Sequence, residues 1–396
     1  MNAYSVFNRG DAGIVVATLQ VLRASLRPTS IKVMSPYHAD NEHFYSLYNS
    51  ASIPSVFDLN PGRSRVWAIF SLLTAFTLAL FLPRSRRFQP YHEADLIFSI
   101  GGGYLYSSVK GPLGIGLLGA LLHIWIAKRL GKPIVLLPQS VGPILYKMDR
   151  LLVAFVLRRA NLIITREHES TFLIKSLGIS NVEENIDIAF FMEPRIQSKG
   201  TRQDPSRIGV TVLDWRFAHR NVSDVHVNLY VSKLADALFR VSERHSVSIS
   251  IFPQVTVGGR DSDLAMSQLL RSECMKLGLE CNIVNLGSIA PERIPERYST
   301  MDVFIGSRMH SAIFALNGRV PTLGLAYQPK MKGTFETLGL QDFTFNIESF
   351  DPLELTEEIC KIIEDGDYPW DEVSSKLLKF EDRLLHLISR EGVASK

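Results

Sequence analysis

The sequence predicts an α/β protein built from two Rossmann-like domains that face each other across a cleft. A chain of 396 residues is longer than one hydrophobic core usually organises, which favours two domains. Strand-like and helix-like segments alternate along most of the chain, as they do where helices cover parallel sheets. A polar stretch rich in breakers, residues 193–206, divides this alternation in two. We therefore expect domains at residues 1–195 and 205–370, and a C-terminal helix within 371–396 that packs back on the first domain.

The first half reads as strands separated by helical crossovers. Residues 3–7 predict a short strand that leads into a turn at 8–11, and apolar residues then recur with helical spacing up to residue 26. Strands and helices continue to alternate beyond this point. The predicted strands are 31–35, 95–100, 133–140 and 161–167, and the predicted helices are 113–130 and 147–158.

A second series begins after the polar stretch. Short runs of β-branched residues predict strands at 207–214, 246–254, 281–287, 302–307 and 320–327, with helical segments between several of them and a final helix near 372–389. In open α/β sheets, ligands bind outside the carboxyl ends of the strands. The residues that directly follow each strand are therefore the first candidates for a functional site.

Composition excludes several classes of function. The chain has 43 basic and 40 acidic side chains and no long basic run, so nucleic acid is not an expected partner. Its three cysteines, Cys274, Cys281 and Cys360, lack zinc-ligand spacing and suggest neither a disulfide framework nor a metal site. The first residues have no basic segment followed by an apolar stretch, which argues against secretion. We expect a cytoplasmic protein.

One apolar segment bears on membrane association. Residues 66–82 carry no charge, and they are flanked by Arg63 and Arg65 before and by Arg84, Arg86 and Arg87 after. A bilayer span usually needs about 20 apolar residues, so this segment is at the short limit. Three interpretations stay open: a helix buried within or beside the first domain, a helix lying on the inner face of the membrane with residues 66–87 in contact, and a true span.

Two glycine motifs follow strands in the first half. Gly10, between Asn8 and Asp11, would let the backbone approach a ligand at a helix start, where exposed amides favour anions; Asp11 could instead only cap the helix. The run Gly101, Gly102 and Gly103 would allow a tight turn or contact with a ligand. It is not a dinucleotide fingerprint, because residue 106 is a tyrosine.

Two polar side chains end strands of the same half. Gln139 can exchange hydrogen bonds with a sugar hydroxyl, although the Gly-Pro that follows is equally compatible with a simple turn. Arg166 emerges at the end of an apolar strand. Its guanidinium can bind a carboxylate or phosphate, or it can pair structurally with a helix acid such as Glu169.

The strongest motif is Ser307-Arg308-Met309-His310, between an apolar strand and the helix that follows. Arg308 and the helix N-terminal amides can hold an anion, and a histidine there can exchange protons near neutral pH. A histidine buried in the core is the alternative. Packing alone explains poorly why Ser307, Arg308 and His310 occur together at the end of a sheet.

Taken in order, these motifs resemble the polysaccharide pyruvyltransferase family. The resemblance runs from about residue 8 to about residue 340. It is carried by NRGDAGIVVA (8–17), SIGGGYL (99–105), LPQSVGP (137–143), ITREHES (164–170), DIAFF (187–191) and GSRMHSAIFALNGRVPTLGLAYQPKMKGTFETLGL (306–340).

The resemblance implies a fold similar to the GT-B glycosyltransferases and a role in capsule, exopolysaccharide or cell-wall polymer synthesis. The reaction it implies moves the enolpyruvyl carbons of phosphoenolpyruvate onto two hydroxyls of a sugar, or of a lipid-linked sugar, with release of phosphate. Arg166, Arg308 and His310 would bind phosphoenolpyruvate, and Lys330 matches the family's basic position after the next strand.

The chemistry of this donor agrees with the residues. Phosphoenolpyruvate carries close to three negative charges, which calls for several cations. We expect His310 to act as acid or base, Asp11 to accept a proton from the acceptor hydroxyl, and Arg308 with Lys330 to stabilise the leaving phosphate. Ser307, Asn8, Gly10, Gly102, Gly103 and Gln139 complete the expected binding residues. The scheme needs no metal and no cofactor.

Two other functions stay open. A nucleotide-sugar glycosyltransferase of the same architecture would also use helix amides and an arginine, since a fold does not decide chemistry. A non-catalytic carbohydrate-binding protein is the second, and it predicts that loss of His310 leaves the biological role intact.

Overall fold

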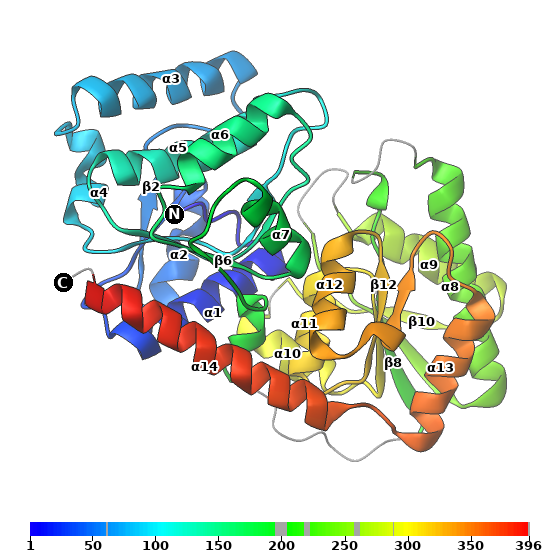
Figure 1. The fold of residues 1–396 in the computed structure, drawn as a ribbon. Coiled ribbons are helices and arrows are strands. Elements are labelled where there is room, and N and C mark those ends of the chain that lie inside the picture. The colour runs from blue at the N-terminus through cyan, green and yellow to red at the C-terminus, as the bar shows by residue number, and fades with distance from the viewer. Residues whose placement is uncertain (61, 195–203, 218–221, 257–261, 288, 395–396) are drawn as a thin grey trace. The chain divides into compact units, whose positions relative to one another are not determined.

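The computed structural model describes residues 1–60, 62–194, 204–217, 222–256, 262–287 and 289–394. The chain forms two compact units (Figure 1). The first unit contains Met1–Val6, Ile14–Ile188 and Lys379–Lys396, and the second contains Phe7–Gly13 and Ala189–Leu378. Two helices, α1 (Arg9–Leu26) and α14 (Trp370–Ala394), contribute residues to both units. Neither unit is therefore a continuous segment of chain.

The first unit is built on a parallel sheet with the strand order β3-β5-β6-β7, in which β4 also pairs with β5. The central strand β5 (Ile134–Val141) is buried along residues 134–139, which explains its continuous apolar run. A separate parallel pair joins β1 to β2. The other strands are β1 (Lys32–Ser35), β2 (Ala51–Pro54), β3 (Ile97–Ser99), β4 (Gly102–Leu105), β6 (Leu162–Thr165) and β7 (Val182–Glu184).

Helices pack on this sheet through apolar faces. Ile124 of one such helix and Leu136 and Ile163 of the sheet are fully buried in a common core. The helices are α2 (His38–Leu47), α3 (Arg65–Phe81), α4 (Gln89–Glu93), α5 (Ile115–Arg129), α6 (Lys147–Leu157) and α7 (His168–Ser176), with short 3-10 turns η1 (Arg86–Phe88) and η2 (Ile188–Phe191). Among the described residues, no single helix is long and apolar enough to cross a membrane; α3 and Arg86–Glu93 meet the criterion as a pair but are bent by 100°.

The second unit contains a six-stranded parallel sheet with the order β10-β9-β8-β11-β12-β13. The chain builds outward from β8 to β10 on one side and from β11 to β13 on the other, so the order reverses between β8 and β11. Such a reversal is where doubly wound sheets bind their ligands. The strands are β8 (Ser206–Thr211), β9 (Val247–Ile251), β10 (Cys281–Ile283), β11 (Val303–Gly306), β12 (Thr322–Ala326) and β13 (Thr344–Asn346).

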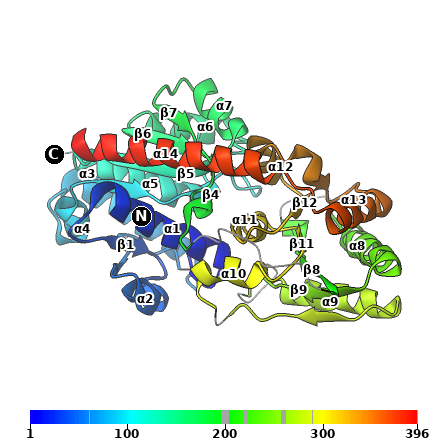
Figure 2. The same ribbon diagram turned by 90° about the horizontal axis from the view of Figure 1, so that it is seen from below.

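The helices of the second unit also pack on its sheet through apolar faces. In α8 (Asp224–Arg244), Val227, Val231, Leu234 and Leu238 recur with helical spacing and are buried against the sheet. Figure 2 shows α8 beside α13 (Pro352–Asp365), outside the strands β8, β9 and β11. The other helices are α9 (Leu264–Lys276), α10 (Ile294–Tyr298), α11 (Met309–Asn317) and α12 (Pro329–Leu338), with 3-10 turns η3 (Trp215–Phe217), η4 (Pro291–Arg293) and η5 (Gln341–Phe343).

The predicted α/β class with parallel sheets is confirmed, and two local expectations are wrong. Residues 3–7 form no strand, because the side chain of Asn41 takes over their backbone groups: Asn41 Oδ1 accepts from the amide of Val6 at 3.3 Å, and Asn41 Nδ2 donates to the carbonyl of Tyr4 at 2.8 Å. Residues 9–11 are not a turn but the first turn of α1. Most of the expected linker, residues 195–203, lies outside the described residues.

Candidate active site

The predicted anion-binding turn lies at the point where the second sheet reverses its order. Strand β11 ends at Gly306 beside Thr211, the last residue of β8, and α11 begins at Met309. Arg308 is the N-cap residue of α11, in extended backbone conformation. The N-terminal amides of this helix and the Arg308 side chain therefore belong to the same carboxyl edge of the sheet, where both favour a negative charge.

A buried aspartate holds the Arg308 side chain. Nε of Arg308 donates to both carboxylate oxygens of Asp263 at 2.9 and 3.0 Å, and Nη2 donates to Oδ1 at 2.6 Å. Asp263 Oδ2 also accepts from the backbone amides of Gln254 and Val255 at 3.0 and 2.9 Å. Burial raises the pKa of the Asp263 carboxyl, and the positive charge of Arg308 partly offsets this. The fork fixes the guanidinium through contacts that a lysine could not reproduce.

Ser307 is fully buried and bonded within the protein. Its Oγ lies 2.7 Å from the hydroxyl of Tyr230, and its amide donates to Thr211 Oγ1 at 3.1 Å. Thr211 Oγ1 in turn lies 2.7 Å from Ser311 Oγ, which donates to the carbonyl of Arg308 at 2.6 Å. Burial raises the pKa of Tyr230, which keeps this phenol protonated. The network supports the backbone of the turn, and direct contact of Ser307 with a substrate stays a prediction.

The first turn of α1 joins this turn within the second unit. A Cβ on Gly10 would stand only 2.4 Å from Nδ1 of His310, so glycine is what allows the imidazole to lie against the helix start. Asn8 caps the helix, because its Oδ1 accepts from the amides of Gly10 and Asp11 at 3.0 and 3.5 Å. Two motifs about 300 residues apart in sequence therefore meet, and Asp11 and His310 lie in neighbouring first turns.

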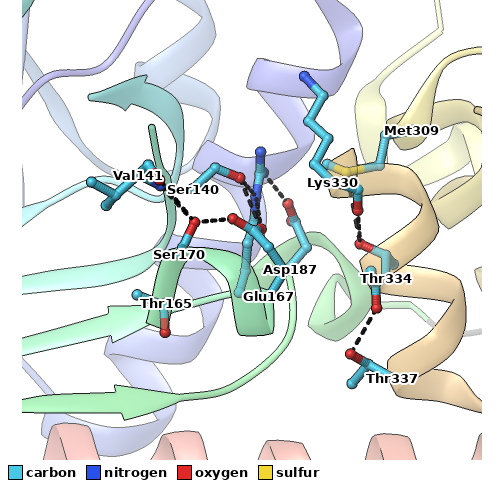
Figure 3. A network of polar contacts seen from close by, with 12 residues as sticks. Ser140, Val141, Thr165, Glu167, Ser170, Asp187, Met309, Lys330, Thr334 and Thr337 are labelled. Atoms are coloured by element: carbon cyan, nitrogen blue, oxygen red, sulfur yellow. Dashed lines mark hydrogen bonds and ion pairs between the residues drawn. The ribbon is translucent and has the colours of Figure 1, made fainter. Parts of the chain in front are cut away.

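Lys330 belongs to the first turn of α12, after β12. Thr334 Oγ1 donates to the carbonyl of Lys330 at 2.9 Å and lies 3.8 Å from Sδ of Met309, so the second turn of α12 touches the first turn of α11. Figure 3 shows the Lys330 side chain extended, with its amine pointing away from Thr334. The second unit thus places the first turn of α11, which contains His310, against the first turn of α1 and the second turn of α12.

Arg166 has a different environment in the first unit. Its Nε donates to Ser140 Oγ at 2.7 Å and lies 3.5 Å from Glu167 Oε2, and Nη1 donates to Asp187 (Figure 3). Only 1% of its side chain is exposed. Burial raises the pKa of Glu167, and the Arg166 charge opposes that effect. The carboxylates that pair with Arg166 are therefore Asp187 and Glu167, not the exposed Glu169.

The glycine run and Gln139 lie beside Arg166. Gly102 pairs with Gln139 in the sheet and has φ of +128°, a conformation that side chains disfavour. A Cβ on Gly103 would stand 3.3 Å from Nη2 of Arg166. The Gln139 carboxamide is fully buried and makes no hydrogen bond of good geometry within the described part of the chain. A buried amide of this kind costs about 1–3 kcal/mol unless a ligand or water satisfies it.

Sequence reasoning missed the residues that support the site. Asp263 holds Arg308, the backbone amide of Gln254 donates to the same carboxylate, and Nε2 of Gln254 is buried without a hydrogen-bond partner among the described residues. Asp187 follows a strand in a motif that was recognised, but no role was assigned to it. Asp263 lies outside every strand-end motif, which left no local signal. No group of three or more metal-ligating side chains occurs in the described ranges.

Comparison with known proteins gives the chain a family and a fold. A family model described as polysaccharide pyruvyl transferase matches residues 8–329. The amylovoran biosynthesis protein AmsJ of Erwinia amylovora is 22% identical over 277 residues, which cover 65% of this chain and 62% of that relative. The match therefore spans less than two thirds of the relative's length.

Several solved structures have a similar fold. UDP-GlcNAc 2-epimerase from Neisseria meningitidis bound to UDP-GlcNAc has a TM-score of 0.56 at 10% identity, covering 97% of both chains. Alr3699/HepE from Anabaena in complex with UDP-glucose has 0.56 at 14%, covering 96% of this chain and 95% of that one. The galactosyltransferase WaaB of the lipopolysaccharide outer core has 0.56 at 11%, covering 100% and 97%. This likeness confirms the predicted GT-B-like fold.

Proposed function

Because the chain belongs to the polysaccharide pyruvyl transferase family, we propose that it transfers the pyruvyl carbons of phosphoenolpyruvate onto a sugar of a polysaccharide or of its lipid-linked precursor. Two sugar hydroxyls add to C2 of the donor, C3 gains a proton, and inorganic phosphate leaves. The product is a cyclic pyruvate ketal. The AmsJ relative, named for the biosynthesis of a polysaccharide, supports this context.

One observation carries the donor assignment: the contact of Gly10 with His310 beside the Arg308–Asp263 fork. The first turns of α1 and α11, the guanidinium of Arg308 and the imidazole of His310 therefore lie where the strand order of the sheet reverses. Such an edge suits a small, highly charged anion, because helix N-terminal amides and a cation lie at the same edge. Lys330, in the first turn of α12, supplies a further cation.

The same residues support a division of chemical roles. We assign to His310 the proton transfer at C3 of phosphoenolpyruvate, and to Asp11 the removal of a proton from the first sugar hydroxyl. Arg308 and Lys330 stabilise the charge that develops on the leaving phosphate. The scheme uses no metal, so we expect activity to survive dialysis against EDTA.

The first unit supports an acceptor role. The buried carboxamide of Gln139, which lies on β5 between Gly102 of β4 and Thr165 of β6, can donate to and accept from a sugar hydroxyl, and Gly102 places no side chain beside it. Arg166 stays a predicted ligand of phosphoenolpyruvate. Its pairing with Asp187 and Glu167 also supports a second role, in which it holds the loop after β6 in place.

Phosphate release from phosphoenolpyruvate in the presence of a membrane extract from the source organism tests the proposal. We expect release by the wild type and a loss of about 10²- to 10⁴-fold in His310→Ala, as for removal of a general acid or base. Circular dichroism and the melting temperature must show that the variant is folded. Release that persists in folded His310→Ala would overturn the role of His310, and no release by the wild type would count against the reaction.

The fold supports one rival function. The similar structures bound to UDP-GlcNAc and UDP-glucose make a nucleotide-sugar glycosyltransferase the alternative. A ligand that binds only the folded protein raises its free energy of unfolding, by about 2.7 kcal/mol at 100 times its Kd. The melting temperature of the protein rises accordingly. We expect this rise with phosphoenolpyruvate. A rise with UDP- or GDP-sugars alone would favour the glycosyltransferase, and a rise with free oligosaccharide alone would favour a carbohydrate-binding protein.

A further inference from the structure

Helix α3 of the first unit presents a broad apolar face to solvent. Its small residues Ala68, Ala75 and Ala79, with Leu72, are buried toward α5, where the rings of Phe76 and Trp125 lie 4.8 Å apart. The opposite face is exposed and contains no charged side chain. Its large members include Val66, Ile69, Phe70, Leu73, Leu80 and Phe81, of which Leu73 is 60% exposed. Contiguous apolar surfaces of this kind mark interaction sites.

The polar groups of this face are satisfied within the protein: Nε1 of Trp67 donates to Asp58 at 3.1 Å, and two threonines bond to carbonyls of the helix itself. The hydroxyls of Thr74 and Thr77 donate to the carbonyls of Phe70 and Leu73, each at 2.8 Å. Both threonines therefore need no water and leave their methyl groups at the surface. A face whose hydrogen-bond donors all have partners inside the protein is suited to an apolar medium. Moving a donor without a partner from water into hydrocarbon costs several kcal/mol of free energy.

The charged side chains of α3 and of the segment after it are basic, whereas Asp58, before the helix, pairs with Arg63 at 3.6 Å. Residues 59–92 contain no Asp or Glu, and arginines flank the helix at both ends. Arg65, Arg84 and Arg86 are exposed and form no ion pair with any described residue. The occupant of this face must therefore be apolar in its centre and negatively charged at its border.

We propose that α3 docks the protein on an anionic membrane, lying in the plane of the surface with its exposed face at the level of the acyl chains. The flanking arginines then meet lipid phosphates, as in other amphipathic helices that bind interfaces. The packed side of the helix stays on α5, so the helix remains part of the unit while it is docked. This docking is independent of the proposed reaction, because all its residues lie outside the candidate active site.

Co-sedimentation of the full-length protein with vesicles tests the proposal. We expect binding to vesicles of phosphatidylcholine with 30% phosphatidylglycerol and much weaker binding to phosphatidylcholine alone. Leu73→Glu should lower the affinity for vesicles at least tenfold, because the burial of a leucine side chain among the acyl chains contributes a factor of ten or more to binding. Arg84→Gln and Arg86→Gln should each lower it about fivefold and reduce its dependence on salt. Leu353→Glu is the matched control, since Leu353 is similarly exposed but lies in the first turn of α13.

The competing occupants give different results. Equal binding by wild type and folded Leu73→Glu would show that another surface meets the lipid, and no binding by the wild type would refute the proposal outright. If light scattering shows a dimer that Leu73→Glu converts to a monomer, and neither form binds vesicles, the face belongs to a second copy of the chain. Circular dichroism must show that each variant keeps its helices.

Discussion

Gly10 is a residue whose side chain must be absent for the candidate site to form. Alanine would place its Cβ 2.4 Å from Nδ1 of His310, so the imidazole must move. We expect Gly10→Ala to lower kcat/KM for phosphoenolpyruvate at least tenfold, because small displacements of a reacting group are costly. Gly116→Ala is the control, since nothing lies within 4 Å of a Cβ there. Equal activity of both variants in the phosphate-release assay would contradict the contact.

Asp263 determines the position of Arg308 without any proposed contact with substrate. Removing one charge of a buried ion pair leaves the other charge buried without an opposite charge, which lowers the free energy of unfolding by about 3–5 kcal/mol. We expect Asp263→Asn to lower the free energy of unfolding by about 3 kcal/mol and to raise KM for phosphoenolpyruvate more than it lowers kcat. Urea unfolding and steady-state kinetics measure the two effects.

The exposed pair of Asp236 and Arg240 on α8 supplies the control for Asp263. Such a surface pair contributes little, so Asp236→Asn should change the free energy of unfolding by less than about 0.5 kcal/mol. An unchanged KM in Asp263→Asn would show that Arg308 does not bind the donor.

His123 makes the stability of the first unit depend on pH. Its ring lies 2.6 Å from the Tyr91 hydroxyl and packs on Phe57, and burial lowers its pKa to about 3. Between about pH 6.5 and pH 3 the unfolded chain binds a proton at this histidine and the folded chain does not. The contribution is therefore complete above the unfolded pKa. It falls by about 1.4 kcal/mol for each pH unit of acidification in this window.

Replacement of His123 isolates that contribution. His123→Gln should be less stable than the wild type at pH 7, and the difference should shrink by about 2 kcal/mol by pH 5. Urea midpoints at the two pH values measure it. Parallel loss of stability in both proteins would show that His123 is protonated in the folded state.

At the scale of elements, α14 connects the two units through one continuous helix. Its residues beyond 378 belong to the first unit, where Leu384 and Ile388 are fully buried and Asn185 Nδ2 donates to the carbonyl of Phe380 at 2.9 Å. We expect Leu384→Ala to cost about 2–5 kcal/mol, as for other fully buried leucines. Leu378→Ala, at an exposed position of the same helix, should cost less than about 0.5 kcal/mol in thermal or urea unfolding. Equal effects would mean that the packed face is wrongly identified.

The sequence was most informative where periodicity and burial agree. The long apolar run of β5 predicted that strand, and the helices expected at 66–82, 113–130 and 147–158 match α3, α5 and α6 to within a few residues. Residues 3–7 have the composition of a strand but form no strand hydrogen bonds. The buried side chain of Asn41 instead binds the amide of Val6 and the carbonyl of Tyr4. Periodicity cannot reveal a side chain that arrives from 35 residues further along.

The candidate site was predictable only in part, for a similar reason. Arg308, His310 and Lys330 each follow a strand, and a strand end is a local signal. Asp263 reaches Arg308 through a tertiary contact across 45 residues of sequence, which no local spacing predicts. The role of Gly10 was expected toward a ligand, whereas the structure gives it a contact with His310.

At the scale of the molecule, the segments that carry the proposed donor site come from three distant parts of the chain. Phosphoenolpyruvate should reduce amide exchange at residues 9–11, 308–311 and 329–331 together, because these are the first turns of α1, α11 and α12. Hydrogen–deuterium exchange with mass spectrometry, with and without the donor, measures this. The helix α3 serves as an internal control that should not respond. Protection restricted to the first unit would move the donor site away from Arg308.

The contact between α1 and α11 joins two residues that are synthesised at different times. Gly10 is synthesised about 300 residues before His310, which it contacts in the folded protein. At about 5–20 residues per second, this interval lasts about 15 to 60 seconds. During it, the first turn of α1 has no native neighbour from α11, and the nascent chain has no complete donor site. The proposed donor site can therefore form only after α11 has been made, well after the first turn of α1.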